Sequence, residues 1–229
     1  AQSQTLEDLV NDPDYIKSVT FNKDPEYMLP VFQMGESVAI EFDDVIGDEA
    51  DYYYQFEHYD YNWQPSRLFK NEFLDGIDDM RIFNYRNSFT TLQSFSHYTL
   101  SIPNQFTRGF KVSGNYMIHI YNDKRELVFS RKFMIMEEKA QVGVEIKRAR
   151  DIKFINTQQR VQYTVDSQEI NFINPADNLK TVIIQNSDIQ TALYDIKPQF
   201  NLGNRQEYRY DTETSFWAGN EYLNFENRD

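Results

Sequence analysis

The sequence contains no cysteine, so neither a disulfide nor a thiolate metal site is available to it. That absence fixes no compartment, although it suits an oxidising one in which a stray thiol is a hazard. Glycine is scarce as well, at 8 of 229 residues. With so little glycine, and with no P-loop or GxGxxG motif, the chain offers no backbone cradle for a phosphate group.

Long hydrophobic runs and positive charge are also lacking. No apolar stretch approaches a length of about 18 residues, which predicts a protein that does not span the membrane. The chain carries 23 basic against 36 acidic residues, for a net charge of −13. A phosphate backbone needs a positive surface that releases its counterions, so nucleic acid is not expected as a partner.

The sequence begins at Ala1, and no signal peptide is visible in it. Such a start is typical of an exported protein whose signal has been removed. A trimmed cytosolic protein would begin in the same way, so the start is consistent with export without establishing it.

Aromatic residues are abundant: they make up 16% of the chain, with 18 phenylalanines and 16 tyrosines. These residues favour the pleated, half-buried surface of a β-strand. About seven strands are expected, separated by turn formers at intervals of about ten residues: 15–21, 27–33, 37–42, 52–59, 89–102, 114–121 and 127–136. This spacing predicts an all-β fold, a β-sandwich of immunoglobulin type.

A charged segment without apolar residues, 137–139, marks the expected boundary of a second domain. Further strands are predicted beyond it: 142–147, 159–165, 179–185, 191–196, 207–210 and 221–225, the last resembling a strand cut short. We therefore expect two immunoglobulin-like β-sandwich domains in tandem. A mobile N-terminal segment (1–14) precedes the first domain (15–137), and the second (138–229) is expected to be incomplete, with truncation the simplest explanation.

The titratable residues form no recognisable catalytic or metal-binding motif. His58, His97 and His119 lie far apart in strand-like runs, so hydrogen-bonded structural histidines are favoured over metal ligands. Adjacent carboxylates, as in DGIDD (75–79), arise by chance among 36 acidic residues, and that loop lacks the alternating ligands of an EF-hand. Since no Gly-x-Ser-x-Gly elbow occurs either, we predict a protein that is not an enzyme and has no cofactor or metal.

One run is unusually rich in aromatic residues, DYYYQFEHYDYNWQPS at 51–66. In a strand, alternate side chains share a face, and the more apolar set is expected in the core: Tyr52, Tyr54, Phe56 and His58. The other set, Tyr53 to Tyr59, is amphipathic and suits a half-exposed sheet or a protein contact. Trp63 is expected to pack at the end of the sandwich. A sugar platform would need exposed, coplanar rings, so a core strand with a protein interface is the favoured interpretation.

Several stretches of the sequence together resemble one protein family. In chain order they are YYYQFEHYDYNWQPS, NEFLDGIDDMRIFNYRNSFTT, SHYTLSIPN, SGNYMIHIYNDKRELVFSRKFMIME and WAGNEYLNFE. Their order and spacing are similar to those of the plug proteins of the Bacteroidota type IX secretion system, formerly a domain of unknown function. The resemblance runs from about residue 19 and is most specific at 52–137. This chain departs from the family at Glu57 and Tyr59, where members often have an aliphatic residue or cysteine.

The resemblance implies a non-catalytic periplasmic protein, exported and associated with the outer membrane. In the family, such a protein closes the periplasmic end of the giant outer-membrane β-barrel translocon, so that barrel is the expected partner. A carbohydrate-binding module or the accessory β-sandwich of a surface glycan-uptake system is the alternative function. A third interpretation, a hydrolase domain, has little support.

The loop 71–91 resembles the most recognisable segment of the family and is long for a sandwich connection. We expect it to contact the barrel together with the outer face of the aromatic run. The expected anchors are Phe73, Leu74, Arg81, Phe83, Tyr85, Tyr53 and Tyr59. The alternative, a loop folded onto its own sandwich, is equally open.

Overall fold

The computed structural model describes residues 12–23, 29–47, 49–88 and 94–218. Those residues form strands and two helices of only four residues each, so the predicted all-β class is confirmed. Neither helix is long and apolar enough to cross a membrane. The chain divides into two compact units, Ala1–Glu137 with Asn186–Gln190, and Glu138–Gln185 with Thr191–Asp229.

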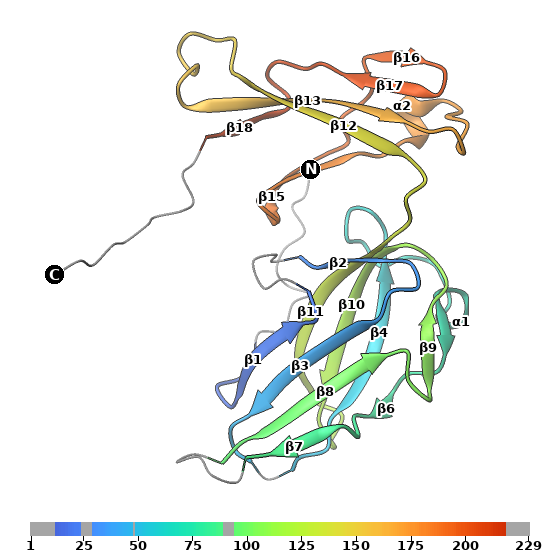
Figure 1. The fold of residues 1–229 in the computed structure, drawn as a ribbon, viewed down its shortest axis with the longest axis vertical. Helices are drawn as coiled ribbons and strands as arrows, with labels where there is room; N and C mark the ends of the chain where they lie inside the picture. The colour runs from blue at the N-terminus through green and yellow to red at the C-terminus, as the bar shows by residue number, and fades with distance from the viewer. Residues whose placement is uncertain (1–11, 24–28, 48, 89–93, 219–229) are drawn as a thin grey trace, which may run out of the picture. The chain divides into compact units, whose positions relative to one another are not determined.

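Two sheets form the first unit (Figure 1). One has the order β1 (Ile16–Phe21), β3 (Val38–Asp44), β8 (Ser96–Ile102), β7 (Tyr85–Asn87). The other has the order β2 (Val31–Gln33), β11 (Leu127–Met136), β10 (Gly114–Tyr121), β4 (Tyr53–Tyr59), β6 (Met80–Arg81). After α1 (Lys70–Phe73), β5 (Leu74–Gly76) and β9 (Thr107–Phe110) pair as a separate ribbon.

The strand order agrees with an immunoglobulin arrangement. In such sandwiches one sheet has the order ABED and the other is built on CFG. Taken in chain order, β1-β3-β8-β7 matches the first pattern, and the sheet containing β4, β10 and β11 matches the second. Strand β2 runs parallel to β11, whereas the other pairs are antiparallel. The sandwich is confirmed, and its immunoglobulin type stays a prediction.

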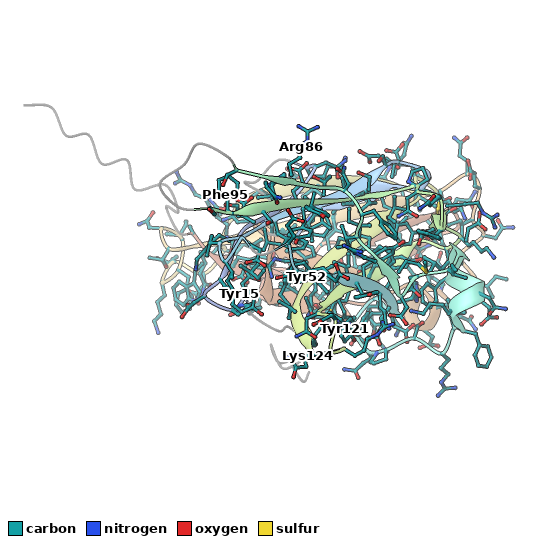
Figure 2. All side chains as sticks on the ribbon, turned by 90° about the horizontal axis from the view of Figure 1, so that it is seen from below. Tyr15, Tyr52, Arg86, Phe95, Tyr121 and Lys124 are labelled. Atoms are coloured by element: carbon teal, nitrogen blue, oxygen red, sulfur yellow. The ribbon has the colours of Figure 1, made fainter. Side chains whose placement is uncertain are left out.

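Aromatic side chains fill the space between the two sheets. Phe133 is fully buried and has five aromatic neighbours, with ring centroids 5.5 to 6.1 Å away: Phe21, Phe32, Phe56, Phe110 and Tyr116. Figure 2 views this arrangement from below: Tyr52 lies inside, whereas Arg86 and Lys124 point outward on opposite sides. The first unit therefore has one continuous aromatic core.

The longer strands were predicted well. The ranges 114–121 and 127–136 coincide with β10 and β11, and their hairpin is confirmed. The alternation in 37–42 is confirmed too, because Val38, Ile40 and Phe42 are all buried. Strand β8 begins at Ser96, and residues 89–93 of the predicted range lie outside the described residues. Strands β5, β6, β7 and β9 were not predicted.

The second unit has a smaller core. Its sheet has the order β12 (Gln141–Arg148), β13 (Gln158–Asp166), β17 (Arg205–Tyr208), β16 (Phe200–Leu202), and β18 (Ser215–Trp217) pairs with β13. Helix α2 (Pro175–Asn178) precedes a hairpin of β14 (Val182–Gln185) and β15 (Asp188–Tyr194). Tyr163 stacks on Tyr208 with ring centroids 4.1 Å apart, and Ile183 of the hairpin packs on this cluster.

The predicted strands of the second unit correspond to β12, β13, β14, β15 and β17, with shifted ends. The range 221–225 lies outside the described residues. The two units divide at Glu137 and Glu138, within the charged segment, although Asn186–Gln190 groups with the first unit. The domain limits 15–137 and 138–229 therefore stay a prediction.

Candidate partner-binding surface on the first unit

The aromatic run forms β4, and its two faces differ as expected except at Tyr59, which belongs to the outer set and is buried. Tyr52, Tyr54 and Phe56 are buried in the core, whereas Tyr53 is half-buried and Glu57 exposed. Strand geometry requires this alternation because successive side chains point to opposite faces. The outer face of β4, with its neighbours β10 and β11, is therefore the surface on which to look for function.

A row of polar side chains crosses that outer face. Ser130 Oγ and His119 Nδ1 are hydrogen-bonded at 2.8 Å, and His119 Nε2 lies 3.2 Å from Glu57 Oε2. The Tyr59 hydroxyl donates to the same oxygen at 2.8 Å. Ser130, His119 and Glu57 come from the adjacent strands β11, β10 and β4. His119 lies directly opposite Ser130, and Glu57 lies opposite Met117, two residues before His119.

The row contains the residue types of a Ser–His–acid catalytic triad. A nucleophilic serine has to be reached by its substrate, yet Ser130 is 0% exposed. The row therefore acts as a cross-link between strands, which agrees with the structural role favoured for the histidines. Sequence reasoning could not find it, because Glu57 and His119 are 62 residues apart.

The hydrogen bond with His119 lowers the pKa of the Glu57 carboxyl to about 2. Burial opposes this shift, and the hydrogen bond from Tyr59 adds to it. The folded state therefore favours the ionised carboxylate. Its stabilising contribution is fully present above pH about 5 and is lost as the pH falls towards 2.

We expect the Glu57→Gln variant to be less stable than the wild type by about 1 kcal/mol near pH 6. The full pKa shift would correspond to more, but the Glu57 side chain is 55% exposed and solvent screens the interaction. The difference should vanish between pH 5 and pH 2, because the wild-type carboxyl becomes protonated. Denaturant unfolding across this pH range measures it, and an equal difference at pH 6 and pH 2.5 would contradict the assignment.

The edge of the sheet beside β4 combines aromatic rings with arginines. The Arg125 guanidinium lies over the Tyr53 ring at 4.6 Å, and that of Arg81 over the Phe83 ring at 5.7 Å. Arg81 also forms an ion pair with Asp51 at 2.6 Å. The Phe83 side chain is 58% exposed. We call Tyr53, Arg81, Phe83 and Arg125 the aromatic–arginine edge.

The carboxylates of the DGIDD stretch support the chain around this edge. Asp75 pairs with Arg108, and Asp79 pairs with Arg125. Asp78 binds Lys70 at 2.8 Å and accepts the backbone N–H of Phe56 at 2.6 Å. Lys70 in turn donates to the Phe56 carbonyl at 2.6 Å, so the open edge of β4 is capped by side chains. Within the described residues, no three candidate ligands gather around a possible metal site.

A comparison with protein families finds a match to the model of the type 9 secretion system plug protein 1st domain, over residues 16–137. This chain belongs to the type 9 secretion system plug protein family. The predicted resemblance is thereby confirmed. A search of curated proteins found no match to this chain.

The chain is also similar to a solved structure, that of a hypothetical protein from Parabacteroides merdae ATCC 43184. The two align with a TM-score of 0.85 and 26% sequence identity. The alignment covers 94% of this chain and 55% of the Parabacteroides chain. This chain therefore spans about half the length of that relative.

The seven residues predicted to anchor a partner fall into two groups. Three lie on the aromatic–arginine edge: Tyr53, Arg81 and Phe83. Of the others, Phe73, Leu74 and Tyr59 are buried, and Tyr85 is half-buried with its ring stacked on Tyr98 at 5.4 Å. Burial leaves the first three without contact surface for a partner. The interface itself stays a prediction.

Up to residue 88, the loop 71–91 folds onto its own sandwich. Strand β5 pairs with β9, β6 with β4, and β7 with β8. Residues 89–91 lie outside the described residues. The segment crosses from the edge of one sheet to the edge of the other, with Ile82 buried and Phe83 exposed. A fold onto the sandwich and an exposed anchor are therefore compatible.

Trp63, which was expected to pack at the end of the sandwich, is buried against residues of β4 and β11. It is 2% exposed, with Tyr59 at 6.1 Å and the Lys132 ammonium over its ring at 4.6 Å. Tyr59 is buried as well. Neither ring is available as a flat surface on which a sugar could stack.

Proposed function

We propose that this plug-family protein is a non-catalytic periplasmic component that closes the periplasmic end of the outer-membrane β-barrel translocon of the type IX secretion system. The single observation that carries this proposal is the family match over residues 16–137. The proposal includes export to the periplasm and association with the outer membrane through the barrel.

A plug acts by steric exclusion, and the first unit has the rigidity that this requires. Its two sheets enclose a continuous aromatic core, in which the rings of Phe42 and Tyr98 stack at 5.1 Å and Phe133 contacts five others. Closely packed cores of this kind deform little. A rigid body below a pore blocks passage without any chemical step.

The aromatic–arginine edge is the contact surface that we propose for the barrel. Aromatic residues and arginine dominate the energetics of protein interfaces. Arg81 and Arg125 are already held in place by Asp51 and Asp79, so less side-chain entropy is lost on binding. A few such anchors with a polar rim suit a modest, reversible affinity, which release for cargo passage requires.

No observation favours the alternative of a carbohydrate-binding module. Such a module stacks exposed aromatic rings on the sugar faces, and Trp63 and Tyr59 are both buried in this protein. The most exposed ring of the described first unit is Phe69, at 76%, followed by Phe83, at 58%.

Capture of the native protein from solubilised membranes, followed by mass spectrometry of its partners, tests the proposal. We expect the barrel translocon to be the principal protein that co-purifies. Recovery of soluble periplasmic proteins alone, from membranes in which the translocon is present, would contradict the proposal.

A further inference from the structure

Strand β12 of the second unit presents uncovered apolar side chains. Val142, Val144 and Ile146 are 58%, 61% and 64% exposed. In the register with β13 they lie opposite Val165, Tyr163 and Val161, all residues of the core cluster. Directly opposed residues of an antiparallel pair share a face. The core-facing side of the sheet therefore continues onto β12, where these three side chains are uncovered.

The backbone of the same residues faces an open edge. Strand β12 is the last strand of its sheet, and within the described residues it pairs only with β13. The Ala149 N–H donates to the Gln158 carbonyl at 3.2 Å. This bond shows which residues of β12 are hydrogen-bonded to β13, because bonded and non-bonded pairs alternate along an antiparallel pair of strands. Odd-numbered residues of β12 bond to β13, so the even-numbered ones direct N–H and C=O outward. Val142, Val144 and Ile146 thus expose both side chain and backbone.

The other edges of the three larger sheets in the described structure are short or irregular. Strands β2, β7 and β16 have three residues and β6 has two. Strand β1 contains a register shift between Lys17 and Thr20. Proteins use such features to prevent edge-to-edge pairing. Strand β12 has eight residues in unbroken register and no proline, so it lacks this protection.

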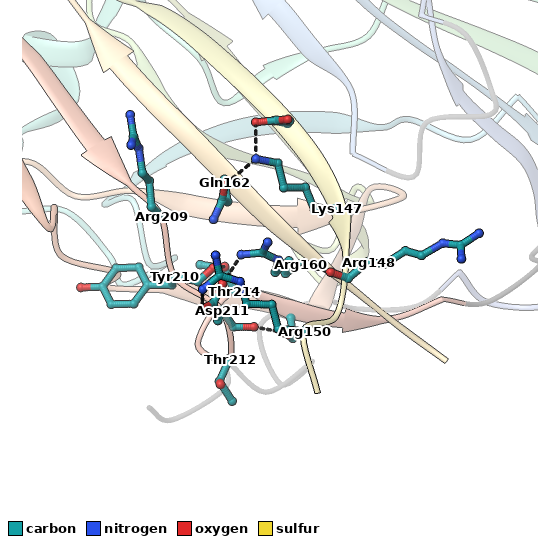
Figure 3. Close-up of polar contacts among 12 residues, drawn as sticks. Lys147, Arg148, Arg150, Arg160, Gln162, Arg209, Tyr210, Asp211, Thr212 and Thr214 are labelled. Carbon is teal, nitrogen blue, oxygen red and sulfur yellow. Dashed lines mark hydrogen bonds and ion pairs between the residues drawn. The ribbon is translucent and has the colours of Figure 1, made fainter. Parts of the chain in front are cut away.

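The opposite face of β12 is already occupied by polar contacts (Figure 3). Lys147 Nζ donates to Gln162 Oε1 at 3.0 Å. Asp211 accepts from Arg150 at 2.9 Å and also pairs with Arg160. These groups are satisfied inside the second unit. The unpartnered surface is therefore the apolar face together with the free backbone edge.

The charges at the two ends of β12 have opposite signs. Glu137, Glu138 and Lys139 precede the strand and leave one net negative charge there. At the other end Lys147, Arg148, Arg150 and Asp151 leave a net positive charge. A second copy running antiparallel brings the acidic end of one chain to the basic end of the other. The three exposed apolar residues are placed symmetrically as well, because Val142 and Ile146 each lie two residues from Val144.

We propose that β12 binds β12 of a second copy of this chain, antiparallel and about a two-fold axis at Val144. In that register Val144 faces its own copy and Val142 faces Ile146. Glu138 faces Arg150, which keeps its ion pair with Asp211 of its own chain. In each of these apolar pairs both residues direct their N–H and C=O groups to the shared edge. Hydrogen bonds between the two copies of β12 then join the two sheets into one. This self-association is independent of the proposed plug function.

The dimer joins the chains through one strand from each copy, so its interface falls at the small end of specific contacts, below about 1,200 Å². We expect a dissociation constant on the order of 100 μM. Sedimentation velocity of the whole chain over a concentration series measures it. A protein that stays monomeric up to about 1 mM overturns the proposal.

Charge substitutions at the two-fold axis test the register. Val144→Asp and Val144→Lys each place like charges directly opposite one another, so each variant alone should dimerise at least about tenfold more weakly. An equimolar mixture should regain association, because aspartate then faces lysine. Position 144 is exposed, so circular dichroism and thermal unfolding should match the wild type. Loss of dimer without recovery in the mixture overturns the two-fold register.

Because the chain has no cysteine, a single cysteine gives a second readout. A hydrogen-bonded antiparallel pair separates Cα atoms by about 5.5 Å, which a disulfide spans. Val144→Cys should therefore form a covalent dimer under mild oxidation. The matched control is Leu202→Cys, on the opposite edge strand β16 and 62% exposed. Equal cross-linking at the two positions overturns the proposal.

Discussion

Replacing Phe133 with alanine is expected to destabilise the first unit by about 3–5 kcal/mol. The ring is 0% exposed and lies among five aromatic neighbours contributed by both sheets. Alanine loses the buried ring surface and leaves a cavity that the surrounding rings fill only in part. Since domains are stable by only about 5–15 kcal/mol, much of the stability of the sandwich is removed.

Denaturant unfolding followed by tryptophan fluorescence measures this loss. The chain has 2 tryptophans, of which Trp63 is buried in the first unit and Trp217 is exposed in the second. In a Trp217→Phe background the signal reports on the first unit alone. The matched control is Phe83→Ala, at an exposed ring, which should change stability by less than about 0.5 kcal/mol. Equal unfolding midpoints for the two alanine variants would contradict the central position of Phe133.

The second large effect is expected on partner binding. Phe83→Ala and Arg81→Glu should each weaken capture of the barrel translocon by about tenfold or more, with little change in stability. Phe83→Ala removes the exposed ring beneath the Arg81 guanidinium. Arg81→Glu replaces the ion pair with Asp51 by repulsion and disrupts the same contact. Titration of the purified translocon with each variant measures the change.

Two matched controls separate a specific contact from a general surface effect. Arg86→Ala removes an exposed arginine that points away from the protein (Figure 2). Phe200→Ala removes a ring in the second unit that is 52% exposed. Both should bind as the wild type does. If they weaken capture as much as Phe83→Ala, the aromatic–arginine edge is not the interface.

The sequence predicted those elements whose signal is local. Val38, Ile40 and Phe42 alternate with polar or small residues, and that period of two is enough to define β3. The turn formers Asn122, Asp123 and Lys124 separate two long runs, so the ends of β10 and β11 agree with prediction. In these segments, local strand preference and tertiary packing favour the same structure.

The short strands depend on contacts that are distant in sequence. Strand β6 has two residues, and it exists because Met80 and Arg81 pair with β4. The same reason explains why Phe73 and Leu74 were expected at an interface although they are buried. Their loop has no periodicity that indicates which side chains face inward, and only its pairing with β9 shows this.

Strand β12 illustrates a different limit of sequence reasoning. The range 142–147 was predicted as a strand and corresponds to β12. Val142, Val144 and Ile146 alternate in it, and by the usual rule such alternation indicates a covered apolar face. Periodicity identifies which side chains share a face and carries no information on what covers it. In the second unit nothing among the described residues covers these three side chains, and their exposure is the basis for the proposed dimer.

The plug function is tested most directly by the permeability of the outer membrane. Cells that produce the translocon should be compared with and without this protein, using uptake of a large hydrophilic antibiotic that the intact membrane excludes. The account predicts that cells lacking the protein become sensitive, and that wild-type protein restores resistance whereas the Phe83→Ala variant restores it only in part. If cells without the protein stay as resistant as the parent strain, the central claim is wrong.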